Sequence, residues 1–390
     1  MKHLNTYITE YIVKKKLDKP IDSEDHCEYF PDTKEELIEN IKECFNNKRY
    51  NLNCINTSKI TDMSYVFKLI PEAHNVNFDI SDWDVSNVEY MQHMFDDCIK
   101  FNCDLSKWNV SNVRHMGDMF SHCLDFEGEG LENWDVGNVK LIDYAFNKCE
   151  NFNCNLSRWN VSNVRSMSFL FNGCKNFEGK GLENWDVSKV EAMNYMFKKC
   201  IKLNCDLSKW DISKVQRISR MFFGCKLFDC DLSKWDVSNV KFMYTMFEGC
   251  NKFKGKGLEN WDVSKVEDMS YMFGDCVNFD CDLSKWNVSN VKNMSNMFMH
   301  CIKFNGDLSN WNTHNLENTT YMFANCISFE GKGLDKWDVS NVQFMSSMFL
   351  RCKSFNCNLN KWNLSSNIKS MNYVFDECTS LKNKPSWYEE

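Results

Sequence analysis

The sequence predicts an α/β repeat solenoid, a right-handed coil of about thirteen turns that each contain 25 or 26 residues. Tryptophan recurs at one period along most of the chain. The residues between successive tryptophans repeat one apolar pattern, which is typical of stacked repeat units. Glycine and proline together occupy only 19 of the 390 positions, so a collagen-like or linker-like chain is excluded.

The tryptophan column sets the period and the domain boundaries. Twelve tryptophans lie 25 or 26 residues apart, at positions 83, 108, 134, 159, 185, 210, 235, 261, 286, 311, 337 and 362. A degenerate copy without tryptophan precedes them at residues 54–67. We therefore expect an N-terminal helical cap at 1–50, the solenoid at 51–378 and a C-terminal cap or tail at 379–390, because the ends of solenoids depart from the repeat.

Each copy contains two apolar periods. Met116, Met119, Phe120 and Cys123 stand at i, i+3, i+4 and i+7, which predicts one face of a short helix. In residues 101–105 apolar and polar residues alternate, which predicts a short strand. One such unit cannot offset the entropy of ordering its own backbone, so neighbouring coils must complete its core.

Some copies carry glycine where the strand is expected. Paired glycines occur at 128/130, 179/181, 255/257 and 331/333, and a single glycine stands at 306. Because glycine tolerates positive φ, the pairs predict a bulge that adjusts the geometry of the stack.

Two amphipathic helices are expected before the repeats. Residues 3–17 form the first, which lacks the apolar core and cleavage site of a signal peptide. Thr33 and Glu36 form a capping box for the second. We interpret this region as a cap over the first coil; the alternative is a helix that docks on a partner or a membrane surface.

The repeat resembles a known family. The string Trp-Asp-Val-Ser-Asn-Val followed by Met-x-x-Met-Phe-x-x-Cys, as in residues 235–261 and 337–362, is similar to the BspA-like leucine-rich repeat. It is closest to the 25-residue variant of Mycoplasma-type surface lipoproteins and large-virus proteins. The resemblance covers about residues 54–378 and implies a leucine-rich-repeat-like solenoid with a binding or adhesion role and no catalytic activity.

The 21 cysteines fall into columns. The first column contains Cys98, Cys123, Cys149, Cys174, Cys200, Cys225, Cys250, Cys276, Cys301, Cys326, Cys352 and Cys378. The second contains residues 103, 154, 205, 230, 281 and 357. We expect the first column to be a buried ladder of small apolar side chains in a reduced protein. Disulfides between coils and zinc at the Cys-x4-Cys pairs are the alternatives, but no structural-zinc spacing is present.

The expected contact surface is the outward face of the predicted strand. Its candidate binding residues are Asp104, Asp206, Asp231, Asp282, Asp307, Asn155 and Asn358. Lysines and one arginine border this row. The Asp or Asn after each tryptophan is interpreted as a turn residue, and the irregular copy around Trp311 as a possible contact point.

The sequence predicts no enzyme, no cofactor and no metal site. His122–Cys123 and His300–Cys301 are adjacent, but neighbouring residues on a helix diverge, so neither forms a nucleophile pair. The net charge of −8 argues against nucleic acid as a partner. No run approaches the roughly 18 apolar residues of a transmembrane segment.

The predicted function is therefore a protein-interaction scaffold with an unidentified protein partner, and the solenoid ends could self-associate. The alternative is a cell-surface or virion-surface adhesin that binds host protein or glycan. Free thiols and the missing signal peptide favour a cytoplasmic or virion-associated location; the alternative is the cell surface by a non-classical route.

Overall fold

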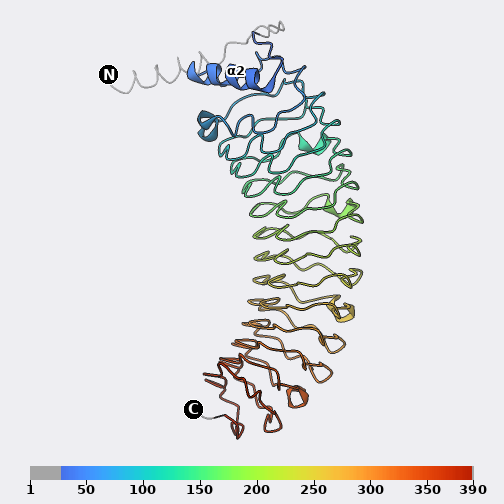
Figure 1. Ribbon diagram of the computed structural model, residues 1–390, viewed down its shortest axis with the longest axis vertical. Coiled ribbons are helices and arrows are strands. Elements are labelled where there is room, and N and C mark those ends of the chain that lie inside the picture. Colours follow the sequence, from blue (N-terminus) through green and yellow to red (C-terminus); the bar gives the residue numbers. More distant parts are fainter. Residues whose placement is uncertain (1–27, 389–390) are drawn as a thin grey trace, which may run out of the picture.

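The computed structural model describes residues 28–388, which form stacked coils curved into an arc (Figure 1). Isolated parallel bridges join most coils to the next, for example Tyr90 to His115 and His115 to Leu141. Bridged residues lie one repeat apart in sequence, so the coils stack in register. The predicted repeat solenoid is confirmed. The expected helix at 3–17 lies outside the described residues.

The second predicted helix is present as α2, Lys34–Asn46. The Thr33 side chain accepts a hydrogen bond from Glu36 N–H at 3.2 Å, and Glu36 accepts one from Asp32 N–H at 2.7 Å. The helix buries Leu37, Ile41, Cys44 and Phe45 in the core shared with the first coils.

The helix predicted within each repeat is wrong. Met116–Met119 and Phe120–Cys123 instead form two successive β-turns, closed by N–H···O bonds of 3.1 and 3.0 Å from the fourth residue to the first. The third residues, Asp118 and His122, have φ of +55° and +63°. Two turns placed end to end put apolar residues at i, i+3, i+4 and i+7, as a helix does, so spacing alone cannot distinguish the two structures.

The turns leave every second N–H free to reach the next coil. Met116, Asp118, Phe120 and His122 donate to carbonyls of the following coil at 2.7–3.0 Å. We call this segment of each repeat, from the bridged residue to the second left-handed residue, the ladder segment. It satisfies buried backbone groups without a regular strand, as buried polar groups require.

The prediction of a strand at 101–105 is also wrong, because these residues form no regular strand. The predicted alternation of buried and exposed side chains is nevertheless present. Phe101, Cys103 and Leu105 are buried, and Asp104 is exposed. Leu105 donates to the carbonyl of Glu129 in the next coil, but Asn102 N–H is satisfied by a side chain, that of Asn77 at 2.9 Å. Side-chain amides therefore replace a continuous backbone ladder here.

Aromatic columns fill the core. The rings of Phe120 and Phe146 stack with centroids 5.5 Å apart, and Trp134 and Trp159 lie 6.5 Å apart. Each tryptophan indole donates Nε1–H to a backbone carbonyl of the preceding coil, as from Trp134 to Leu105 at 3.2 Å. The tryptophans are therefore buried structural residues and do not form an exposed ridge. Trp387 continues the column by donating to Leu359 at 2.9 Å.

Each of the four glycine pairs is followed by a short 3-10 turn. These turns are η2 (Leu131–Asn133), η3 (Leu182–Asn184), η4 (Leu258–Asn260) and η5 (Leu334–Lys336). A further turn, η1 (Pro71–Asn75), follows the first coil. Gly128 and Gly130 have φ of +91° and +90°. A Cβ on Gly130 would overlap the backbone nitrogen of Ser106. The glycine pairs therefore allow a left-handed backbone and a close approach between neighbouring coils. They do not form the predicted β-bulge, because this part of the repeat is not a strand.

The first cysteine column is buried except at its last member, Cys378, which is partly exposed. From Cys123 onward, each thiol of this column donates to the carbonyl of a phenylalanine in the preceding coil, as from Cys149 to Phe120 at 2.9 Å. Burial raises the pKa of the Cys149 thiol far above its usual range. All twenty cysteines within residues 28–388 are free thiols.

We expect the Gly130→Ala variant to lose stability. The left-handed conformation alone costs an alanine about 1–2 kcal/mol, and the backbone of Ser106 must also move. The urea midpoint should fall. Gly137→Ser is the matched control, because Gly137 lacks a positive φ and serine stands at the same position in other copies. Equal midpoints for the two variants would contradict the assigned role of Gly130.

Burial of the thiols predicts the order of native alkylation. Cys205, Cys281 and Cys357 are partly exposed and should react with iodoacetamide at least about tenfold faster than Cys174 or Cys225, which require local opening. Peptide mass spectrometry of a labelling time course measures each site separately. Uniform labelling of both columns in folded protein would show that the first column is not buried.

Candidate functional site

The predicted binding residues form one outward column, and each has a local structural partner. Every member accepts a hydrogen bond from the backbone N–H two residues later, as Asp206 Oδ1 does from Ser208 at 2.9 Å. The members are Asp104, Asn155, Asp206, Asp231, Asp282, Asp307 and Asn358. The column thus forms turns, a role that sequence reasoning assigned only to the residues after the tryptophans.

The charge of this outward column is partly neutralised. Lys256 Nζ lies 2.9 Å from Asp231, and Lys332 Nζ lies 3.0 Å from Asp307. The Lys256 ammonium lowers the pKa of Asp231 to about 2. Asp104, Asp206 and Asp282 are exposed and form no ion pair with any described residue. Their carboxylates are the members of the column best able to meet a partner.

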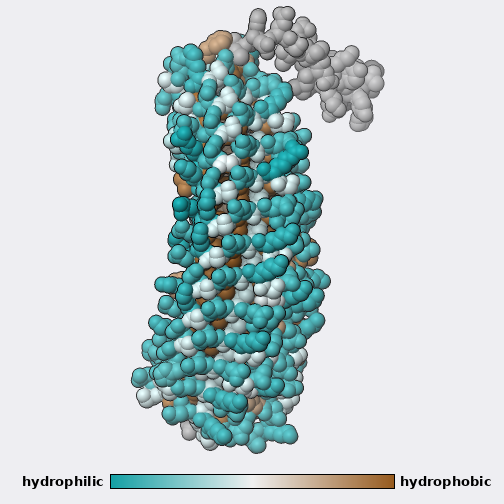
Figure 2. Space-filling model, turned by 90° about the vertical axis from the view of Figure 1, so that its right-hand side faces the viewer, coloured by the Kyte–Doolittle hydropathy of each residue, from teal (hydrophilic) through white to brown (hydrophobic). Residues whose placement is uncertain are grey.

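The surface seen from the outer side of the arc is mainly hydrophilic, with a narrow band of small and apolar residues along the axis (Figure 2). A shallow depression between coils is lined by Asn155, Gly179, Cys205 and Asp206 among others. Half-buried thiols thus lie next to the outward column. Burial raises the pKa of Cys103, in the same cysteine column, to about 12, so these thiols are weak nucleophiles.

The ladder segments carry most of the exposed large apolar side chains. Thirteen such residues are exposed within the described chain, and eight of them lie on ladder segments. Four are at bridged positions: Tyr90, Leu141, Phe242 and Phe344. Four are at the first left-handed position: Tyr65, Tyr271, Tyr321 and Tyr373. We call these eight side chains the ladder face.

Aromatic residues at the left-handed position stack on one another. Tyr144 and Phe169 have centroids 4.3 Å apart, and Phe169 and Tyr195 are 4.2 Å apart. The Arg220 guanidinium covers the Tyr195 ring at 5.3 Å and donates from Nη1 to its hydroxyl at 2.6 Å. These side chains are ordered by their neighbours, which reduces the entropy that binding must remove.

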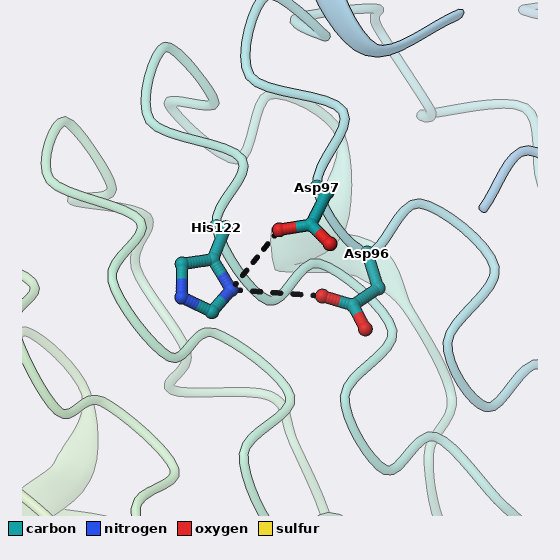
Figure 3. A group of neighbouring side chains, drawn as sticks. All are labelled: Asp96, Asp97 and His122. Carbon is teal, nitrogen blue, oxygen red and sulfur yellow. Dashed lines mark ion pairs between the residues drawn. The ribbon is translucent and has the colours of Figure 1, made fainter. Parts of the chain in front are cut away.

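A cluster of two aspartates and one histidine lies between neighbouring coils (Figure 3). His122 Nδ1 is 3.6 Å from Asp96 Oδ1 and 3.6 Å from Asp97 Oδ1. Lys68 Nζ contacts the other carboxylate oxygens, at 2.5 Å from Asp96 Oδ2 and 3.0 Å from Asp97 Oδ2. His93 Nδ1 lies 3.0 Å from Asp96 Oδ2.

The turns of the ladder segment position this cluster. Asp97 and His122 occupy the second left-handed position of successive coils, with φ of +68° and +63°. The Asp96 side chain is 7% exposed, whereas that of Asp97 is 47% exposed. Burial alone would raise the pKa of Asp96, but His122, Lys68 and His93 outweigh it and hold that pKa well below its usual range.

Sequence reasoning missed this cluster, although its spacing was a usable signal. Asp96 and Asp97 precede His122 by 26 and 25 residues, one repeat, so stacking places them side by side. The neighbouring His122 and Cys123 do not pair: Cys123 donates inward to Phe95 at 3.1 Å, while His122 faces the aspartates. In the same way His300 Nδ1 pairs with Asp275 at 2.6 Å.

The irregular copy around Trp311 makes regular contacts. Thr313 Oγ1 donates to the carbonyl of Asp338 at 2.9 Å, and His314 Nδ1 lies 2.8 Å from Asp338 Oδ2. Thr319 is fully buried and donates to the carbonyl of Phe344 at 3.3 Å. Its unusual residues therefore have structural partners within the stack.

Solved structures similar to this chain are leucine-rich repeat proteins. One, from Eubacterium ventriosum, is 15% identical and has a TM-score of 0.41, with 90% of this chain and 89% of that chain covered. Another, from Bacteroides ovatus, is 16% identical and has a TM-score of 0.37, with 83% and 81% covered. No curated protein matches the chain. Within residues 28–388 no helix has the length and apolar character to cross a membrane.

The family comparison covers nearly the whole repeat region. One family model matches four times, at residues 36–158, 142–257, 243–333 and 303–388. This confirms the resemblance drawn from the repeat motif. The chain belongs to the family described as Mycoplasma protein of unknown function, DUF285.

Proposed function

We propose that the protein is a non-enzymatic scaffold that binds another protein through its ladder face. The observation that carries the proposal is that eight of the thirteen exposed large apolar side chains of the described residues lie on the ladder segments. Aromatic side chains are enriched where proteins bind one another, because they bury a large area at a small entropic cost.

The ladder face suits a large partner. Its eight residues lie on eight different coils, so an extended partner can contact several coils at once. Coil-to-coil hydrogen bonds fix their backbone, as from Tyr271 N–H to Ser295 O at 2.9 Å. Little ordering is then required on binding.

The outward column is proposed as a second contact surface, with Asp104, Asp206 and Asp282 as its unpaired carboxylates. Its charges would favour a basic partner and steer its approach. The alternative function is adhesion to a host protein or glycan at a cell or virion surface. The cytoplasmic or virion-associated location, and self-association through the solenoid ends, belong to the same proposal.

We expect removal of four ladder-face rings to abolish partner binding. The variant is Phe242→Asn, Tyr271→Asn, Tyr321→Asn and Phe344→Asn, since asparagine stands at both positions in other copies, as in Asn293 and Asn296. Loss of aromatic anchors costs about 2 kcal/mol or more each at an interface centre, so affinity should fall more than about tenfold. Proteins crosslinked to the chain in its native source, identified by mass spectrometry and remeasured with purified components, provide the assay.

A second variant removes charge from the outward column and tests the two surfaces against each other. Asp206→Asn with Asp282→Asn preserves the turns, because Asn155 and Asn358 form the same turns with amides. Both variants should keep the urea midpoint of the parent chain. If only the outward-column variant loses the partner, that column is the binding surface. If no partner responds to either variant, the scaffold function assigned to these faces is wrong.

A further inference from the structure

The side chains of Asp96, Asp97 and His122 bring three electron-pair donors together at a site open to solvent. One ligand atom from each residue lies within 4.8 Å of a ligand atom from both others, and the carboxylate oxygens that face His122 Nδ1 are Asp96 Oδ1 and Asp97 Oδ1. The two oxygens are 3.6 Å from the imidazole nitrogen, beyond hydrogen-bonding distance (Figure 3). Ligands about 2.0–2.2 Å from one ion lie about 3–4 Å apart, so the spacing fits ligands of one ion.

His122 Nδ1 faces the two carboxylates and one hydroxyl. Asn147 Nδ2 donates to Ser121 Oγ at 3.2 Å, and Ser121 Oγ lies 3.0 Å from His122 Nδ1. To bind an ion, the ring must be neutral with its proton on Nε2, so that the single lone pair of Nδ1 faces the ion. The Ser121 hydroxyl must then turn its hydrogen away from Nδ1, because that lone pair cannot accept a hydrogen bond and bind the ion at the same time.

We propose that Asp96, Asp97 and His122 bind a divalent cation of the first transition row, with water in the remaining positions. Carboxylate and imidazole ligands suit ions such as Mn²⁺ and Fe²⁺, whereas thiolate-rich sites select softer ions. Asp97 and His122 are about half and one-third exposed, so an ion can enter, while Asp96 is held in place by burial.

Lys68 and His93 complete the surroundings of the site. They contact only Oδ2 atoms of Asp96 and Asp97, which leaves both Oδ1 atoms to the ion. Asp118 Oδ2 lies 3.7 Å from His93 Nε2 and so supports that imidazole from the far side. Partners of this kind orient metal ligands and tune affinity. The Lys68 ammonium also repels the ion and limits its affinity.

The same columns hold a contrasting pair seven coils away. Asp275 and His300 are hydrogen-bonded at 2.6 Å, so the nitrogen and oxygen already satisfy each other. The position corresponding to Asp96 is Gly274, which has no side chain to offer as a third ligand. His300 is therefore the matched control for His122.

Binding of Mn²⁺ alone to the full chain tests the proposal, since Mn²⁺ avoids thiols. Electron paramagnetic resonance of the free ion should show saturable binding of one equivalent. Asp97→Asn and His122→Ala should each weaken binding at least about tenfold, whereas His300→Ala should leave it unchanged. Lys68→Met should tighten binding, and Mn²⁺ should raise the urea midpoint of this variant more than that of the parent.

The opposing outcomes are distinct. Absence of saturable binding up to about 1 mM Mn²⁺, the weakest range of functional protein sites, would overturn the proposal. So would binding that Asp97→Asn and His122→Ala leave unchanged while both retain the parent urea midpoint. If a variant fails to fold, the Lys68→Met measurement still decides: a midpoint that Mn²⁺ does not raise excludes the ion from these carboxylates.

Discussion

The structure depends on the hydrogen bonds that run from each ladder segment to the next coil. A β-turn uses only one backbone N–H in four, and a buried N–H without a partner costs about 1–3 kcal/mol. Met116, Asp118, Phe120 and His122 meet this requirement by donating to carbonyls one coil away. No coil satisfies its own backbone, so the coils form only as a stack.

The left-handed turn residues follow from this constraint. A residue such as Tyr195, with φ of +59°, occupies a conformation that costs an L-residue about 1–2 kcal/mol. The hydrogen bonds from Tyr195 N–H to Ser219 O and from Phe197 N–H to Met221 O, both 3.0 Å, offset that cost in the same segment. The chain accepts local strain because the alternative is unpaired buried backbone.

Sequence periodicity predicted the stack, the buried columns and α2, because these depend on where apolar side chains recur. It misassigned residues 116–123 as a helix, since Met116, Met119, Phe120 and Cys123 have the same spacing on two turns. The difference lies in the sign of φ at Asp118 and His122, which side-chain type does not determine. The prediction of a strand at 101–105 was wrong for a related reason. Alternation of apolar and polar residues determines which side chains are buried, but it does not determine the backbone hydrogen bonds. The Asn77 side chain accepts the hydrogen bond from Asn102 N–H that a neighbouring strand would have accepted.

For the candidate sites, too, the sequence predicted which side chains are exposed but not which hydrogen bonds they form. The outward position of Asp206 was predictable from alternation, whereas its turn role needed the position of Ser208 N–H. The Asp96, Asp97 and His122 cluster could have been found by aligning successive repeats, because stacking turns a separation of one period into a contact. Reading along the chain instead paired His122 with Cys123, which points into the core.

Stacking also explains why function should be sought in departures from the repeat. Columns that recur in every coil, such as the tryptophans, make the same contact each time and maintain the stack. The first left-handed position of each ladder segment is held by backbone hydrogen bonds that do not depend on the side chain, so Tyr271, Asn296 and Tyr321 can follow one another there. Surface changes of this kind usually alter stability by no more than about 0.5 kcal/mol. A group such as Asp96, Asp97 and His122, confined to two neighbouring coils, is therefore not required by the repeat, and this is why we propose a binding role for it.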